Sequence, residues 1–169
     1  MISLSRRGFL TSAAVASTLL AADGVRAGTP PLLLHDPALP AGRRFAARIE
    51  MLGGEAVALE GDRVRQIQAA LAHAPVALFA VTQRSDELLV GEIAAEHGYR
   101  RIALVRHVRD GRMTARCMAE GKTIGALAHF AGTGWPEAFA DMALDKIGQC
   151  PAVSDGNIEP AFSWVMIRA

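Results

Sequence analysis

The stretch Val76–His107 constrains the fold more than any other part of the chain. It opens with a continuous apolar run at 76–81, passes through a polar loop at 82–86, and continues in a helical pattern as far as His97. A short run without a polar position suits a strand that is covered on both faces inside a parallel sheet. The sequence therefore predicts a strand, a loop, a helix and a second strand in this order, with 76–81 as the central strand of the sheet.

The helix after this strand is predicted from its ends and from its periodicity. Ser85 or Asp86 can cap the first turn, because a short side-chain oxygen accepts hydrogen bonds from N–H groups that have no partner within the helix. Gly98 ends it. Its apolar and acidic positions fall on different faces, so the apolar stripe can lie on the sheet. The apolar positions are Leu89, Val90, Ile93 and Ala94, and the acidic ones are Glu87, Glu92 and Glu96.

Strand and helix patterns alternate on both sides of this stretch. Apolar runs at 32–34 and 56–59 enclose a helical pattern at 41–52. Such alternation is typical of a parallel sheet with right-handed crossovers and helices on its faces. We therefore predict an α/β fold with three layers and a doubly wound, mostly parallel sheet of flavodoxin-like strand order. An Asp-Gly turn predicts an antiparallel hairpin at residues 102–118, whereas a strand, a short helix and a long loop all stay open for 119–134.

Polar side chains follow two of the predicted strands. Open α/β sheets bind ligands at the carboxyl ends of their strands, where the direction of winding reverses. If the first and the third strand are neighbours, their two loops form one site there. The candidates for acid-base catalysis in this site are His35, Asp36 and Asp86. The candidates for ligand binding are Thr82, Gln83, Arg84 and Ser85, with an anion favoured by the arginine and by the start of the helix.

Local roles would explain the same residue types. Asp36 before Pro37 suits a turn, Ser85 and Asp86 suit helix caps, and Arg84 can pair with an acidic neighbour on the surface. No histidine pair at zinc spacing and no Cys-x-x-Cys is present, so no metal site is predicted. A Gly-x-Ser-x-Gly elbow is absent as well. Histidines near the ends of elements are interpreted as surface residues, namely His73, His97 and His107.

The first 27 residues have the pattern of an export signal. Ser5-Arg6-Arg7-Gly8-Phe9-Leu10 precedes a segment rich in Ala, Ser and Thr, which Val25-Arg26-Ala27 follows. This resembles a twin-arginine (Tat) signal peptide whose last removed residue is Ala27. The resemblance implies export to the periplasm in the folded state by the Tat translocation machinery, which leaves residues 28–169 as a single α/β domain. About 15 mildly hydrophobic residues fall short of the roughly 20 that span a membrane; retention as an uncleaved anchor is the alternative.

The charge and the cysteines of the mature part limit its function further. The leader holds three arginines and one aspartate, so that of 18 basic and 17 acidic residues 15 and 16 stay in the mature part, a formal charge of minus one. This balance argues against sequence-independent binding of nucleic acid, which needs a basic face. Cys117 and Cys150 could form a disulfide in an oxidising periplasm, or they could be two buried thiols too far apart to bridge.

The sequence thus predicts an exported α/β protein and leaves three functions open. The first is a non-catalytic ligand-binding or accessory protein that holds a small anionic ligand or a co-exported protein. The second is a small hydrolase or transferase in which His35 works with Asp36 or Asp86, and it requires these side chains to converge on one reacting centre. The third is a redox protein that carries a cofactor. This third function is implied only by the resemblance to a Tat signal peptide, because proteins exported by this route often carry a cofactor. The sequence indicates no particular cofactor.

Overall fold

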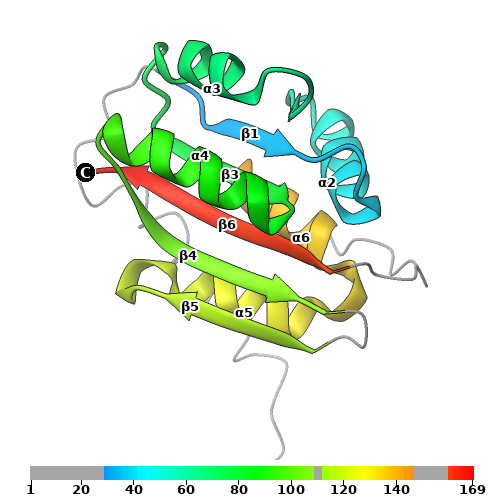
Figure 1. Cartoon of the computed structure of the whole chain (residues 1–169). Helices are drawn as coiled ribbons and strands as arrows, with labels where there is room; N and C mark the ends of the chain where they lie inside the picture. Colours follow the sequence, from blue (N-terminus) through cyan, green and yellow to red (C-terminus); the bar gives the residue numbers. More distant parts are fainter. Residues whose placement is uncertain (1–28, 109–111, 147–159) are drawn as a thin grey trace, which may run out of the picture.

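The computed structural model describes residues 29–108, 112–146 and 160–169, which form one six-stranded sheet with helices on both of its faces (Figure 1). The predicted leader, the Asp-Gly turn and Cys150 lie outside these ranges. The strands are β1 (Leu32–His35), β2 (Val57–Ala58), β3 (Ala77–Thr82), β4 (Tyr99–His107), β5 (Met113–Cys117) and β6 (Ala161–Arg168). The helices are α2 (Pro40–Met51), α3 (Arg63–Leu71), α4 (Arg84–Glu96), α5 (Lys122–Ala131) and α6 (Trp135–Ala143).

The sheet is mixed rather than mostly parallel. Its strand order is β2-β1-β3-β6-β4-β5. β1 runs parallel to β2 and β3, whereas β6 runs antiparallel to both of its neighbours, β3 and β4. β4 and β5 form the predicted antiparallel hairpin. The mostly parallel, flavodoxin-like prediction is therefore wrong in one respect, because the last strand of the chain is inserted between β3 and β4 (Figure 1).

β3 is the central strand that its apolar run predicts. All six of its residues are buried, and their side chains alternate between two separate cores. Leu78 and Ala80 belong to the core under α3 and α4, while Phe79 and Val81 belong to the core under α2, α5 and α6. Because both faces of β3 are covered, no position of the strand has to be polar.

The two cores make the fold a sandwich of three layers (Figure 1). On one face, Phe45 of α2 and Phe139 of α6 pack ring against ring, with centroids 5.5 Å apart. On the other face, α3 and α4 cover the indole of Trp164, which is fully buried in β6. Covering both faces of β6 in this way explains how a strand at the end of the chain occupies an interior position in the sheet.

The predicted start of α4 is wrong by two or three residues. The helix begins at Arg84, its N-cap residue is Gln83, and no side chain caps it. Ser85 and Asp86 therefore lie in the first turn, where an acidic side chain still interacts favourably with the helix dipole. Glu87 was predicted on a polar face, but its side chain is fully buried. Gly98 does end the helix, with a φ of +82°.

The segment at 119–134 is helical. A short 3-10 helix, Ala119–Gly121, leads into α5, and a second one, Gly132–Gly134, leads into α6. Gly121 is needed at the first junction, because a Cβ there would lie 2.1 Å from the carbonyl oxygen of Ile102. Glycine and alanine interrupt the apolar pattern of this segment, which is why its periodicity left the structure open.

Candidate functional site

The loops after β1 and β3 lie side by side, as the candidate site required. His35 is in register with Val81, and the N–H of Asp36 donates a hydrogen bond to the carbonyl oxygen of Val81 at 2.9 Å. From this point the chain enters α2 on one face of the sheet and α4 on the other face. The winding of the sheet thus reverses between β1 and β3, at the position where α/β sheets bind ligands.

His35 and Asp36 are both buried at this reversal point. Oδ1 of Asp36 accepts a hydrogen bond from the N–H of Ala38 at 2.9 Å, so the aspartate does form the predicted turn. Its Oδ2 and the Nδ1 of His35 are buried without a hydrogen-bond partner among the described residues. A buried polar atom without a partner costs about 1–3 kcal/mol. The turn alone therefore leaves two polar atoms of this pair unexplained.

Asp86 completes the polar cluster at the reversal point. Its Oδ1 lies 3.1 Å from Nε of Arg63, the first residue of α3. Burial raises the pKa of Asp86, the carboxylate of Asp36 raises it further, and Arg63 lowers it. Burial also lowers the pKa of His35, against the opposing influence of Asp36. The structure thus brings the three predicted acid-base candidates into one electrostatic environment that favours a neutral imidazole and disfavours the charged form of Asp86.

The four residues predicted to bind a ligand do not form one site. Thr82 is buried, and its Oγ1 accepts a hydrogen bond from Nε1 of Trp164 at 3.0 Å while it donates to the carbonyl oxygen of Gln83. Gln83, Arg84 and Ser85 are exposed. The guanidinium of Arg84 lies 5.6 Å from the ring centroid of Phe162 in β6. Thr82 is therefore occupied inside the fold, and Arg84 contributes to a different part of the surface.

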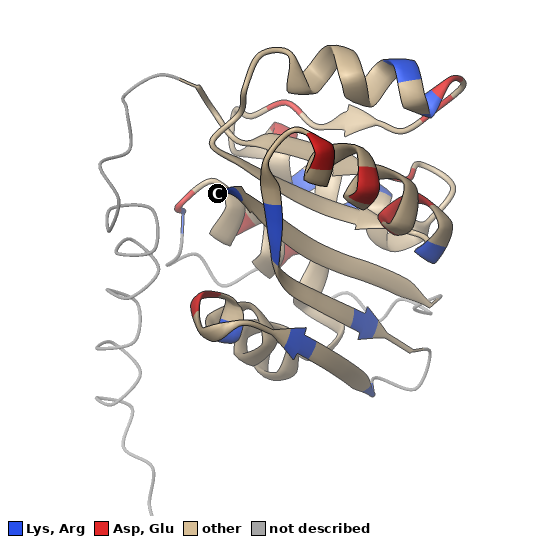
Figure 2. Cartoon of the chain, turned by 60° about the vertical axis from the view of Figure 1, so that its left-hand side comes forward, with Lys and Arg blue, Asp and Glu red and all other residues tan. Residues whose placement is uncertain are grey.

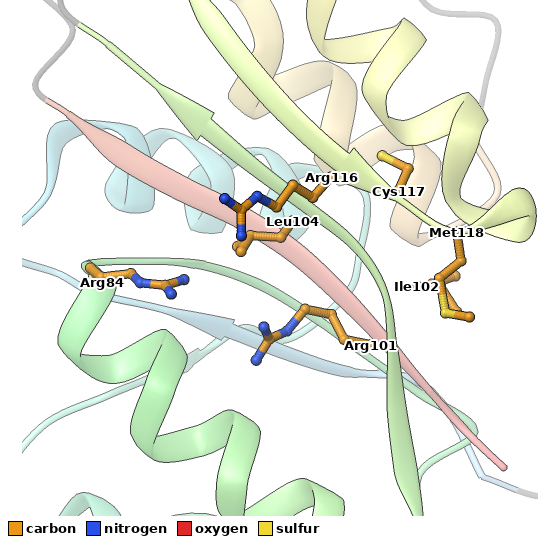
Figure 3. Close-up of a pocket in the computed structure, with 7 residues that line it drawn as sticks. All are labelled: Arg84, Arg101, Ile102, Leu104, Arg116, Cys117 and Met118. Atoms are coloured by element: carbon orange, nitrogen blue, oxygen red, sulfur yellow. The ribbon is translucent and has the colours of Figure 1, made fainter.

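An open hollow on the α4 side of β4, β5 and β6 is the second candidate site, and we call it the arginine trough. It consists of two adjoining hollows of about 310 and 500 Å³, which share Arg84, Leu104 and Arg116. Figure 3 shows the guanidinium groups of Arg84, Arg101 and Arg116 pointing toward the same space above Leu104. Figure 2 shows basic positions on β4 and β5 and acidic ones along α4. The trough is lined by Arg84, Arg101, Leu104, Arg106, Arg116 and Phe162, together with neighbouring residues of β4 and β5.

The strand register explains why arginines gather here. Arg106 is paired with Thr114 and Phe162, and Leu104 is paired with Arg116, so that these side chains share one face of the sheet. β4 has a β-bulge between Arg101 and Ala103. Because of it, the successive residues Ile102 and Ala103 both face the core under α5, and Arg101 lies on the trough side. No helix in the described ranges covers this face of β5, since α5 packs on the opposite face.

Glu87 is the one carboxylate that contacts the arginines of the trough among the described residues. It forms an ion pair with Arg84 and lies 2.6 Å from Nη2 of Arg101. Gly91 leaves room for the Arg101 side chain, because a Cβ there would lie 2.7 Å from Nη2. Arg106 and Arg116 are exposed and form no ion pair within the described residues. Four arginines and one glutamate leave the trough with about three positive charges.

His107 is buried, which contradicts its interpretation as a surface residue. Its ring stacks on Trp135 with centroids 3.5 Å apart, and Nε2 lies 2.8 Å from Oγ of Ser163. Burial lowers the pKa of His107 to about 3. So weak a base would not activate the neighbouring hydroxyl at neutral pH. We therefore assign this pair to the core rather than to catalysis.

Three further points from the sequence concern a disulfide, a metal site and a membrane span. Cys117 is half-buried on β5, but Cys150 lies outside the described residues, so the disulfide stays a prediction. Within the described ranges, no three His, Cys, Asp or Glu side chains are grouped so that they could hold a metal ion. The same ranges contain no helix with the length and apolar character that a membrane crossing requires.

Comparisons with known proteins add no assignment. No family model, curated protein or solved structure matches the chain. What the fold and the sites define is a mixed α/β sandwich with a polar cluster at its winding reversal and a basic trough beside α4.

Proposed function

We propose that the chain is an exported, non-catalytic protein that binds an anionic ligand or partner in the arginine trough. One observation carries this proposal: Arg106 and Arg116 project from neighbouring strands into the same open trough, and neither has a carboxylate partner among the described residues. Guanidinium groups recognise carboxylates and phosphates through two parallel hydrogen bonds. Their arrangement over an apolar floor of Leu104 and Phe162 suits a ligand that carries both acidic and apolar groups.

The position of Arg84 also supports the trough. Arg84 was predicted to fix an anion beside His35 and Asp36, and it instead lies over Phe162 at one end of the trough. The carboxylate of Glu87 forms an ion pair with Arg84 in this position, and it forms a second ion pair with Arg101. A side chain fixed in this way loses less conformational entropy when a ligand binds. The prediction of an anionic ligand is thus kept, with its place moved from the winding reversal to the α4 side of the sheet.

Export through the Tat machinery is the second part of the proposal, and the leader at 1–27 supports it. We expect the protein from a periplasmic extract to begin at Gly28, and we expect replacement of both Arg6 and Arg7 by lysine to keep it in the cytoplasm. Intact mass spectrometry of the two fractions measures this directly. A full-length chain recovered from the membrane fraction would instead support an uncleaved anchor.

Calorimetric titration with inorganic pyrophosphate tests binding in the trough. We expect the double variant Arg106→Gln/Arg116→Gln to bind at least about tenfold more weakly than the unchanged protein, a loss of about 1.4 kcal/mol. Arg65→Gln is the matched control, because Arg65 is an exposed arginine on α3 outside the trough. Added salt should weaken binding, since the charges are open to solvent. Equal affinities of the double variant and the control would refute the trough as the site.

A hydrolase or transferase at the winding reversal is the second candidate. Two observations favour it. One buried polar atom each of His35 and Asp36 has no hydrogen-bond partner in the described part of the chain, and burial raises the pKa of Asp86. Hydrolysis of 4-nitrophenyl acetate and 4-nitrophenyl phosphate by the purified protein tests it. Turnover that His35→Gln abolishes and that Arg106→Gln leaves unchanged would support this function over binding alone. Equal rates for the protein and for buffer with both probes would reject it for these ester classes.

A further inference from the structure

The outer edge of β5 lies directly beside the arginine trough. β5 is the last strand of the sheet on this side, and β4 is its sole neighbour among the described strands. Its three middle residues, Thr114, Ala115 and Arg116, are exposed. An edge strand offers a row of backbone N–H and C=O groups with which another chain can pair. The edge and the trough can therefore be occupied by one and the same ligand.

Two hydrogen bonds determine which residues of β5 face this edge. The N–H of Met118 donates to the carbonyl oxygen of Ile102 at 2.8 Å, and the N–H of Val108 donates to that of Arg112 at 2.9 Å. Hydrogen-bonded and non-hydrogen-bonded pairs alternate along an antiparallel ladder. The backbone groups of the even-numbered residues therefore point toward β4. Those pointing outward belong to Met113, Ala115 and Cys117.

The side chains of β5 show the complementary alternation. Thr114 and Arg116 lie on the trough face, whereas Ala115 and Cys117 face α5, as a Cβ at Gly125 would lie 3.2 Å from each of them. A strand added next to β5 would place every second side chain on the trough face, beside Thr114 and Arg116. Acidic side chains at these positions would meet Arg106 and Arg116, which form no ion pair with another described residue.

We propose that an extended, acidic segment of a partner protein adds to the edge of β5 as a seventh strand and places its carboxylates in the arginine trough. The inference rests on the proposed function, because it names the class of ligand for the same trough. Backbone hydrogen bonds to Ala115 and Cys117 would position the added strand, and the arginines would select for acidic side chains on it. A second copy of this chain is disfavoured as the occupant, because pairing of β5 with itself would bring two basic troughs together.

Synthetic peptides of about ten residues in which glutamate alternates with threonine are the probes. Calorimetry measures their affinity for the full chain, and amide-resolved hydrogen exchange measures the protection of the β5 backbone. We expect the peptide to slow exchange at the amides of Ala115 and Cys117 by at least about tenfold, as hydrogen bonding of these outward groups requires. Methylation of alternate peptide nitrogens should weaken binding by at least about tenfold, since it removes donors for the new ladder. Replacement of glutamate by lysine should abolish binding.

The outcomes separate this inference from the proposed function. Binding of pyrophosphate or of the peptide that depends on Arg106 and Arg116, but gives no protection at Ala115 and Cys117, keeps the anion-binding function and overturns strand addition. Equal affinities of the peptide and its N-methylated form overturn it as well. If neither probe binds, the proposed function fails and the inference fails with it. Self-association of the chain through this edge would identify a second copy as the occupant and overturn the acidic partner.

Discussion

Acidification should destabilise the protein through His107. Burial between β4, β6 and α6 lowers the pKa of this imidazole from 6.5 to about 3 in the folded state. At a pH between these two pKa values, His107 of the unfolded chain binds a proton and His107 of the folded protein does not. The stability that depends on the neutral ring is therefore fully present above about pH 6.5 and is lost progressively as the pH falls toward 3.

The size of this effect follows from the separation of the two pKa values. Each pH unit inside the window lowers the free energy of unfolding by about 1.4 kcal/mol. From pH 7 to pH 5 the loss is about 2 kcal/mol, because titration of the unfolded state begins near pH 6.5. This is a large share of a total stability of about 5–15 kcal/mol. The midpoint of thermal unfolding should fall by about 5 °C over the same interval.

Urea unfolding at a series of pH values between 7 and 5 measures this slope. His107→Gln is the informative variant, because an amide can still reach Oγ of Ser163 but does not titrate. We expect the slope of stability against pH to become shallower in the variant by about 1.4 kcal/mol per pH unit below pH 6. Burial also lowers the pKa of His35, which adds a loss of the same sign to both proteins and cancels in the comparison.

Nuclear magnetic resonance of the imidazole protons provides an independent test if the variant fails to fold. The ring of His107 should show no titration between pH 7 and pH 5 in the folded protein. Titration of this ring near pH 6.5, or identical pH slopes for the protein and its variant, would show that burial does not disfavour the imidazolium and would refute the reasoning.

Two further substitutions test contacts beside the two candidate sites. Glu87→Gln should lower the free energy of unfolding in urea by about 2 kcal/mol, because the buried carboxylate loses its ion pairs with Arg84 and Arg101. Glu92→Gln on the exposed side of α4 should change it by less than about 0.5 kcal/mol. Equal losses in the two variants would show that these ion pairs do not stabilise the fold. Gly42→Ala should cost about 1–3 kcal/mol in the same assay, because its Cβ would lie 2.2 Å from the carbonyl oxygen of Asp36. Ala47→Gly, at an exposed position of α2, should cost about 1 kcal/mol by helix propensity alone, and a Gly42 variant that loses no more than this would contradict the close approach.

The elements that sequence reasoning found are those with strong local signals. The central strand at 76–81 has no polar position, and the structure buries β3 completely. The sequence of the hairpin at 102–118 contains an Asp-Gly pair between its two strands, and β4 and β5 pair as predicted. The helix predicted at 41–52 begins one residue earlier, at Pro40, and α4 begins two or three residues before its predicted start. Local patterns were sufficient here because the periodicity of the apolar residues within each element indicates whether it is a helix or a strand.

The order of the strands could not be read in the same way. The residues 162–167 have a pattern typical of a strand, but nothing in them indicates that this strand lies between β3 and β4 rather than at an edge. Insertion there is decided by the packing of Trp164 and Val165 on opposite faces of the sheet, against helices that are more than twenty residues away in the chain. Long-range packing of this kind overrides any local pattern.

The candidate site was predicted in part for the same reason. His35, Asp36 and Asp86 follow strands whose neighbourhood could be inferred, and they do lie together. Arg106 and Arg116 could be assigned to the predicted hairpin. They line an open trough because no described helix covers this face of β5, and that depends on the order of the strands. The buried ion pairs of Glu87 were missed because helical periodicity placed it on the polar face, and no local pattern shows that Arg101 reaches it across Gly91.

The trough exists because β4 continues into a hairpin instead of a crossover helix. In a sheet of alternating strands and helices, the segment after β4 would form a helix over the sheet on the same face as α4. Here the chain turns back at once into β5, and α5 then packs on the opposite face. Among the described residues no helix covers β5 on this face, and the floor of the trough beside it would be an exposed apolar surface if the rim were not charged. Arg84, Arg106 and Arg116 of the rim are exposed to solvent, and in the proposed function the same charges would select an acidic partner over an apolar one.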